Sequence, residues 1–168
     1  MFKNLIKQNQ LAFIILTILF LIDRFSKFFI LKLVEQGEKL DIYITSYLNL
    51  YLIWNKGIAF GLLSFNENMI YNIITVLILI IIFTILIMII KSKGFVKYSL
   101  VIVLAGALGN VFDRIYYSAV PDFIDFHINE FHWFIFNIAD IFVTIGVFCL
   151  IYVELFINKE IKNNEKNY

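Results

Sequence analysis

Four aspartates gather in one stretch of a very apolar chain, where their side chains could carry out acid–base chemistry. Two asparagines accompany them, and the six residues are Asn110, Asp113, Asp122, Asp125, Asn137 and Asp140. Carboxylates near a membrane core are costly and usually serve a functional site. If two of them approach within about 3 Å in a poorly hydrated site, they cannot both ionise and they share a proton. One then acts as a base toward water and the other as an acid toward a carbonyl, which is aspartic-protease chemistry.

Other nucleophiles are poorly supported. Neither Ser64 nor Ser118 has an obvious histidine partner, and the single cysteine, Cys149, lies away from the aspartates. Peptide hydrolysis by two aspartates and a water needs no cofactor, so we expect none.

The composition indicates an integral membrane protein. The 168 residues are 61% hydrophobic and only 16% charged, and the mean hydropathy is +0.86. Such a chain cannot present a wetted surface on all sides. Its net charge of +1 is not that of a nucleic-acid-binding surface, so we expect no nucleic-acid partner.

Four segments are apolar and long enough to cross a hydrocarbon layer of about 30 Å, which takes about 20 helical residues. They are about 11–31, 69–90, 96–112 and 137–157. The first is too long for the apolar part of a signal peptide and contains Asp23, Arg24 and Lys27. We therefore interpret it as a permanent helix.

The lysines predict the orientation of these helices. They cluster before the first segment, between the second and third, and after the fourth, at Lys3, Lys7, Lys91, Lys93, Lys97, Lys159, Lys162 and Lys166. Because positive residues favour the cytoplasmic side, we expect both termini in the cytoplasm, with 158–168 as a solvated cytoplasmic tail. The connections 32–68 and 113–136 then lie outside, although three lysines in the first make the bias imperfect.

The first outer connection predicts a β-element. Between residues 42 and 53, apolar residues alternate with tyrosine, threonine and asparagine, a period-2 pattern typical of strands. An Asn-Lys-Gly turn signal follows at 55–57. We place a small β-element at about 40–63, resting on the outer membrane surface.

Helical spacing places the polar residues on shared faces. In the third segment, the spacing i, i+4, i+7 relates Gly106, Asn110 and Asp113. In the fourth, the spacing i, i+3, i+7 relates Asn137, Asp140 and Thr144. Both sets lie at the outward ends of helices, and small residues from Ala105 to Gly109 let another helix approach closely. Because Asp122 lies in the short connection between these helices, Asp122 and Asp140 can meet near the outer boundary of the bilayer.

Five motifs, in this order, resemble those of lipoprotein signal peptidase, also called signal peptidase II. They are Asp23 in the first segment, Asn-Lys-Gly-Ile-Ala-Phe-Gly at 55–61, Gly-Ala-Leu-Gly-Asn-Val-Phe-Asp-Arg at 106–114, Val-Pro-Asp-Phe at 120–123 and Phe-Asn-Ile-Ala-Asp at 136–140. The resemblance covers nearly the whole chain and is highly specific. It implies an aspartic endopeptidase of the bacterial cytoplasmic (inner) membrane. Such an enzyme cuts the signal peptide from a prolipoprotein immediately before its diacylglyceryl-modified cysteine.

The resemblance also implies a fold and partners. We expect one membrane peptidase domain, 1–168, in the class of all-α membrane proteins. It would have four transmembrane helices, a small extracytoplasmic β-cradle and a short mobile surface helix near 57–68, with the active site at the outer face. The implied partners are diacylglyceryl-modified prolipoprotein substrates and membrane lipids. We expect a monomer.

Carried over position by position, Asp122 and Asp140 match the catalytic pair of the family. The positions that match its supporting or substrate-binding residues are Asp23, Asn55, Gly57, Phe60, Gly61, Asn110, Asp113, Arg114 and Asn137. The chain departs from the usual family residues at Ala105, Pro121 and Ile141. Pro121 fixes φ at about −65° and removes a backbone donor directly before Asp122. None of the three departures removes a carboxylate, so they bear on fine specificity and turnover and leave the family assignment in place.

Some acidic residues have structural alternatives. Asp113 and Arg114 could form an ion pair at the end of the third helix, and Asp23 could pair with Lys27 one turn later. Asp125 could by spacing alone belong to the catalytic pair, although the family pattern argues against it.

Two histidines suggest a metal site as an alternative. The set Asp122, Asp125, His127 and His132 supplies hard and imidazole ligands within eleven residues. Their spacing matches no metal motif, so we expect no metal and place the histidines in an aromatic belt at the membrane interface.

Two functions of other classes stay open. A small transporter or proton relay would use Asp23, Asp113 and Asp140, but a relay needs acidic groups through the full depth of the bilayer. Here the inner halves of the helices are nearly uniformly apolar. A non-catalytic assembly or lipid-binding protein would tolerate asparagine in place of either Asp122 or Asp140.

Overall fold

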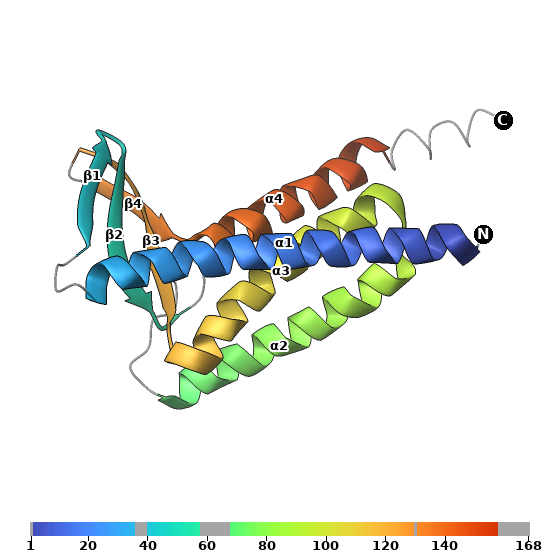
Figure 1. The fold of residues 1–168 in the computed structure, drawn as a ribbon, viewed down its shortest axis with the longest axis horizontal. Coiled ribbons are helices and arrows are strands. Elements are labelled where there is room, and N and C mark those ends of the chain that lie inside the picture. The colour runs from blue at the N-terminus through green and yellow to red at the C-terminus, as the bar shows by residue number, and fades with distance from the viewer. Residues whose placement is uncertain (1, 36–39, 58–67, 130, 158–168) are drawn as a thin grey trace.

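The computed structural model describes residues 2–35, 40–57, 68–129 and 131–157, and within them four helices carry a four-stranded sheet at one end (Figure 1). The helices are α1 (Phe2–Glu35), α2 (Asn68–Lys91), α3 (Gly94–Tyr117) and α4 (Ile138–Tyr152), and α4 continues into a π-helical turn, η2 (Val153–Ile157). All four predicted helices are present, and α1 and α3 extend beyond their predicted bounds. The beginning of α1 and the end of α4 both lie at the end of the bundle away from the sheet (Figure 1).

Within the described residues, three helices are long and apolar enough to cross a membrane, at Tyr71–Lys91, Gly94–Tyr117 and Ile138–Phe156. α1 is not among them, and it carries the buried charged residues Asp23 and Lys27. The count of four transmembrane helices therefore stays a prediction. The outer face of α2 exposes large apolar side chains such as Ile80 and Phe83, as a surface in contact with lipid does.

Glycines allow α3 to pack closely against its neighbours. A Cβ atom added at Gly106 would overlap the carbonyl oxygen of Ala139 in α4. At Gly109 the added atom would lie 2.6 Å from Asp23 Oδ2, so this glycine lets α1 bring a carboxylate against α3. The predicted close approach at the small residues of this helix is thereby confirmed.

The sheet is antiparallel, with the order β1 (Asp41–Thr45), β2 (Leu48–Asn55), β3 (Val120–Ile128) and β4 (Phe131–Phe136). The β-element predicted at about 40–63 is confirmed for β1 and β2, whereas residues 58–63 lie outside the described part of the chain. The expected all-α class is wrong. Apolar and aromatic residues from 120 to 136 form a β3–β4 hairpin, because such residues pack well on a pleated, half-buried surface.

The turn after α3 sets the direction of β3. Ser118 adopts a left-handed conformation with φ of 55°, and its N–H donates to the carbonyl oxygen of Arg114 over 3.1 Å, which ends the helix. Further along β3, Phe123 packs with Ile30 and Leu40 in a buried apolar cluster. The last turns of α1 thereby hold β3 against the helices.

Candidate active site

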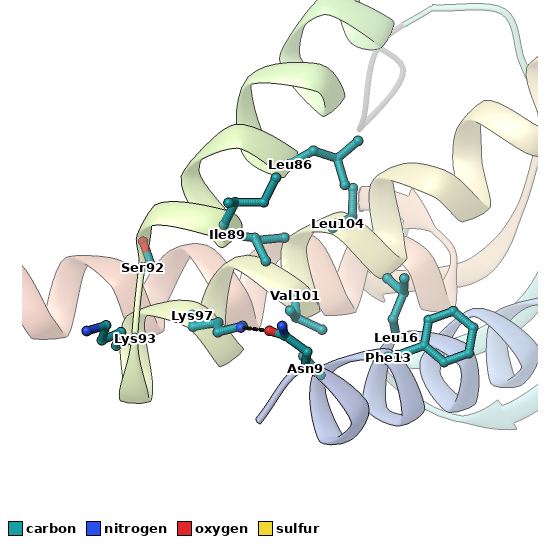
Figure 2. A pocket seen from close by; sticks show the side chains of 12 residues that line it. Asn9, Phe13, Leu16, Leu86, Ile89, Ser92, Lys93, Lys97, Val101 and Leu104 are labelled. Atoms are coloured by element: carbon teal, nitrogen blue, oxygen red, sulfur yellow. Dashed lines mark hydrogen bonds between the residues drawn. The ribbon is translucent and has the colours of Figure 1, made fainter. Parts of the chain in front are cut away.

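A cavity of about 410 Å³ lies between α1, α2 and α3 at the end of the bundle away from the sheet. Figure 2 shows its mostly apolar lining, with Lys97 Nζ donating a hydrogen bond to Asn9 Oδ1. Among the described residues, no carboxylate lines this cavity. The buried aspartates lie about 20 Å further along α3, where the helices meet the sheet.

Asp122 of β3 and Asp140 of α4 are held together by Asn137. Its side-chain Nδ2 donates to Asp122 Oδ1 over 2.5 Å, and its backbone N–H donates to Asp140 Oδ2 over 3.2 Å. Asp122 is 1% exposed and Asp140 is 6% exposed. The structure therefore brings the two predicted catalytic carboxylates into one buried group.

The local sequence of α4 explains the position of Asp140. Asn137 is the N-cap of the helix, and its Oδ1 accepts a hydrogen bond from the Asp140 N–H over 3.1 Å. Because the Asp140 side chain in turn accepts from the Asn137 N–H, the two residues form a capping box. The positive end of the helix dipole also favours a carboxylate in this first turn.

Asp122 accepts its hydrogen bonds from the side-chain amides of two asparagines. Asn55 Nδ2 donates to its Oδ2 over 2.9 Å, while Asn137 holds the other oxygen. Burial, together with the nearby carboxylate of Asp140, raises the pKa of Asp122 from 3.8 to about 6. The hydrogen bonds from the two asparagines oppose this rise only in part.

Asn110 connects this pair to a second buried group. Its Nδ2 donates to Asp140 Oδ1 over 2.8 Å, and its Oδ1 accepts a hydrogen bond from Lys27 Nζ over 3.0 Å. The predicted face that carries Asn110 and Asp113 is confirmed, because Lys27 Nζ also lies 2.6 Å from Asp113 Oδ2.

The second group is an ion-paired cluster between α1 and α3. Lys27 Nζ lies 3.0 Å from Asp23 Oδ1, which confirms the suggested pair, and Arg24 Nη1 lies 2.6 Å from Asp113 Oδ1. Asp23 Oδ1 also accepts from the backbone N–H of Ala139 over 3.1 Å. The two acids and two bases of the cluster balance in charge. Because their contacts join α1 to both α3 and α4, the cluster holds the three helices together.

The suggested ion pair between Asp113 and Arg114 is wrong. Arg114 Nη2 donates instead to the carbonyl oxygen of Gly57 over 2.6 Å, and the Gly57 N–H donates to Asn55 Oδ1 over 2.7 Å. This chain of contacts fixes the Asn55 amide so that its Nδ2 faces Asp122. Phe60 and Gly61, the surface helix near 57–68 and Ser64 lie outside the described residues.

The roles of Arg24 and Lys27 as partners of Asp113 were missed from the sequence. A signal was present, because Asp23, Arg24 and Lys27 lie within five residues of an otherwise apolar segment. Charged residues at that depth need partners on neighbouring helices.

Asp125 does not belong to the group around Asn137. It is 1% exposed, and its Oδ2 lies 2.8 Å from Nδ1 of His132 in β4. Because successive side chains of a strand point to opposite faces, Asp125 and Asp122, three residues apart, lie on different faces of β3. The geometry gives no support to Asp125 as a member of the catalytic pair.

The chain is similar to known proteins over most of its length. A family model described as signal peptidase (SPase) II matches residues 15–156. A protein of Pelagibacter ubique (strain HTCC1062) named lipoprotein signal peptidase is 55% identical over 96% of this chain and 97% of its own length. A protein of the same name from Anaplasma phagocytophilum (strain HZ) is 38% identical over 89% of this chain and 94% of its own. A solved structure of a bacterial membrane enzyme, 29% identical, matches with a TM-score of 0.70 and covers 88% of this chain and 94% of that one.

Proposed function

The chain belongs to the signal peptidase II family, and on that premise we propose that it is an aspartic endopeptidase that removes signal peptides from prolipoproteins. Membership of this family supports a membrane protease that acts on prolipoproteins in a bacterium. The cleavage point is the peptide bond before the diacylglyceryl-modified cysteine. The catalytic pair is Asp122 and Asp140.

The observation that carries this proposal is a contrast between two pairs of buried aspartates. Asp23 and Asp113 both contact Lys27, so their negative charge is neutralised by a cation. The hydrogen bonds to Asp122 and Asp140 come from amide groups, and no ion pair to either is found among the described residues. Two buried carboxylates that lie close together and are not ion-paired favour a state in which they share one proton, as an acid–base pair must.

The reaction uses one water molecule and one shared proton. The ionised carboxylate removes a proton from the water as its oxygen attacks the carbonyl carbon of the scissile bond. The protonated carboxyl donates its proton to the carbonyl oxygen. When the tetrahedral intermediate collapses and the C–N bond breaks, the carboxyl that took the water proton gives it to the leaving nitrogen. The other carboxylate takes a hydroxyl proton from the intermediate, so the pair again holds one proton. The pKa of Asp122, raised to about 6 by burial and by the neighbouring Asp140, supports a pair that can share one proton.

Three asparagines and one arginine position the reacting groups. Asn55, Asn110 and Asn137 direct their amide groups at the two carboxylates and so limit their rotation. Arg114 Nε is buried and has no hydrogen-bond partner among the described residues, so it can donate to a substrate carbonyl. Gly57, Phe60 and Gly61 complete the substrate-binding segment in this proposal.

The proposed location follows from the placement of the charges. With both termini in the cytoplasm, the sheet and the two aspartates lie at the outer face of the cytoplasmic membrane. A substrate signal helix then enters from the bilayer, and its lipid, anchored in the outer leaflet, sets the depth of the scissile bond. The protein acts as a monomer surrounded by membrane lipids.

The test is cleavage of a lipidated prolipoprotein by purified protein carrying Asp122→Asn or Asp140→Asn. Each change removes a carboxyl that must give or take a proton, so we expect kcat to fall by at least about 100-fold. Gel mobility of the processed product measures the rate, and thermal unfolding in detergent establishes that each variant is folded.

The matched control is Asp41→Asn, which makes the same chemical change at an exposed position of β1. It should cleave at the wild-type rate. Full cleavage by a folded Asp122→Asn or Asp140→Asn protein would rule out the mechanism in which these two aspartates act as the catalytic pair.

A further inference from the structure

A second cluster of chemically active side chains lies on the outer hairpin, away from the proposed catalytic pair. Asp125 and His127 lie on the same face of β3, because side chains at positions i and i+2 of a strand point to the same side. His132 lies opposite His127 in the neighbouring strand β4. A carboxylate oxygen and a nitrogen from each histidine lie within 4.8 Å of one another.

The distances within this cluster are close to those between the ligands of one metal ion. His132 Nδ1 lies 2.8 Å from Asp125 Oδ2, and His127 Nδ1 lies 3.5 Å from the same oxygen. Ligands of a tetrahedral zinc ion, at about 2.0 Å from the metal, are about 3.3 Å from one another. Small side-chain rotations therefore bring the three groups to coordination distance.

Several buried polar atoms here make no hydrogen bond within the part of the chain that the structure describes. They are Asp125 Oδ1, His127 Nδ1 and, on β2, Asn49 Oδ1. Asp125 is 1% exposed and His127 is 8% exposed, so leaving these atoms unsatisfied is costly. Asn49 pairs with Asp125 in the register of β2 and β3, which brings its oxygen to the same site.

The site is also accessible. A cavity of about 450 Å³ is lined by Asn49, Asp125 and His132, so an ion can reach the cluster. One carboxylate and two neutral imidazoles carry a net negative charge, and imidazole suits zinc, copper and nickel better than magnesium or calcium.

We propose that Asp125, His127 and His132 form a binding site for a divalent transition-metal ion of the zinc type, with Asn49 or water completing the coordination. From the sequence we expected no metal, because the spacing of the four possible ligands matched no known metal motif. That set of four included Asp122, which is not in this cluster. The ion would join β3 to β4 and stabilise the hairpin on the face opposite Asp122.

Zinc binding tests this inference directly. Protein without a polyhistidine tag, purified in detergent and stripped with a chelator, is titrated with ZnCl₂ and in parallel with MgCl₂ in a calorimeter. We expect saturable binding of zinc and none of magnesium. His132→Ala and Asp125→Asn should each weaken zinc binding by at least about tenfold.

Phe131→Ala is the matched control, because it removes an exposed ring from the same strand without removing a ligand. It should bind zinc like the wild type. No saturable zinc binding by the wild type, or equal zinc affinity in His132→Ala and the wild type, would overturn the proposal. The His132 side chain is 56% exposed, so its removal leaves the fold in place.

Cobalt provides a second measurement, because Co²⁺ in a tetrahedral site absorbs visible light strongly. We expect such bands with the wild type and their loss in His127→Ala. Unchanged bands in His127→Ala would exclude His127 as a ligand and refute the three-residue site. Neither readout depends on proteolysis, so the outcome is independent of the proposed function.

Discussion

At the scale of single residues, the surroundings of each aspartate determine what its carboxyl can do. Asp113 forms an ion pair with Lys27, whereas burial and the neighbouring Asp140 raise the pKa of Asp122 to about 6. The suggested pairing of Asp113 with Arg114 failed for a geometric reason. Arg114 Nη2 is directed to the carbonyl oxygen of Gly57, while Lys27 and Arg24 of α1 occupy the two oxygens of Asp113.

The raised pKa of Asp122 predicts how stability depends on pH. An unfolded aspartate loses its proton near 3.8 and the folded Asp122 near 6. Between these values the folded state binds more protons, so the free energy of unfolding decreases as pH rises from about 4 to about 6. The loss from this one group is at most about 3 kcal/mol, because each pKa unit corresponds to about 1.4 kcal/mol.

The measurement is the Tm in detergent across this pH range, compared between the wild type and Asp122→Asn. We expect the wild type to lose Tm relative to the variant as pH rises from about 4 to about 6. A constant difference between the two proteins across the range would contradict the raised pKa.

At the scale of elements, α1 differs from the other helices because its charged residues form part of the bundle interior. Lys27 is 2% exposed and contacts both Asp23 and Asp113, so it joins α1 to α3. A buried pair that loses one partner leaves an uncompensated charge, which is strongly destabilising.

Lys27→Met tests this link between α1 and α3. The change keeps most of the side-chain volume but leaves two carboxylates beside each other without their lysine, and we expect a loss of about 3–5 kcal/mol. Thermal unfolding of the purified variant measures it. Lys32→Met, an exposed position on the same helix, should keep the wild-type Tm. Equal Tm values for the two variants would show that the cluster contributes nothing to stability.

At the scale of the whole molecule, the sheet and the two aspartate groups lie at one end of the bundle, and the beginning of α1 and the turn between α2 and α3 lie at the other (Figure 1). This polarity agrees with the orientation that the lysines predict, with the sheet outside. It also leaves the acidic residues concentrated at one end, which is unlike a relay that crosses the bilayer.

Thiol labelling in spheroplasts tests the orientation. In a Cys149→Ser background, Tyr47→Cys on the exposed β1–β2 turn should react with a membrane-impermeant reagent. Lys93→Cys, between α2 and α3, should react only after the membrane is permeabilised. The reverse pattern would place the sheet in the cytoplasm and exclude the proposed route for a lipid-anchored substrate.

The sequence by itself predicted the four helices, the first two strands and the helical face that carries Asn110 and Asp113. These features depend on local periodicity and hydrophobicity, which can be read directly from neighbouring residues in the sequence. The grouping of Asp122 with Asp140 came partly from helical spacing and partly from family resemblance. The strand at 120–128 was not predicted, because the periodicity of a short apolar run does not distinguish a strand from a connecting loop.

Only the tertiary structure decided which charges neutralise one another. Lys27 lies far along the chain from Asp113, yet the close approach that Gly109 permits brings them within 2.6 Å. In the same way, strand register brought Asp125, His127 and His132 together where their spacing matched no motif. Electrostatic partners depend on distance in space, and sequence spacing determines that distance only within one helix or strand.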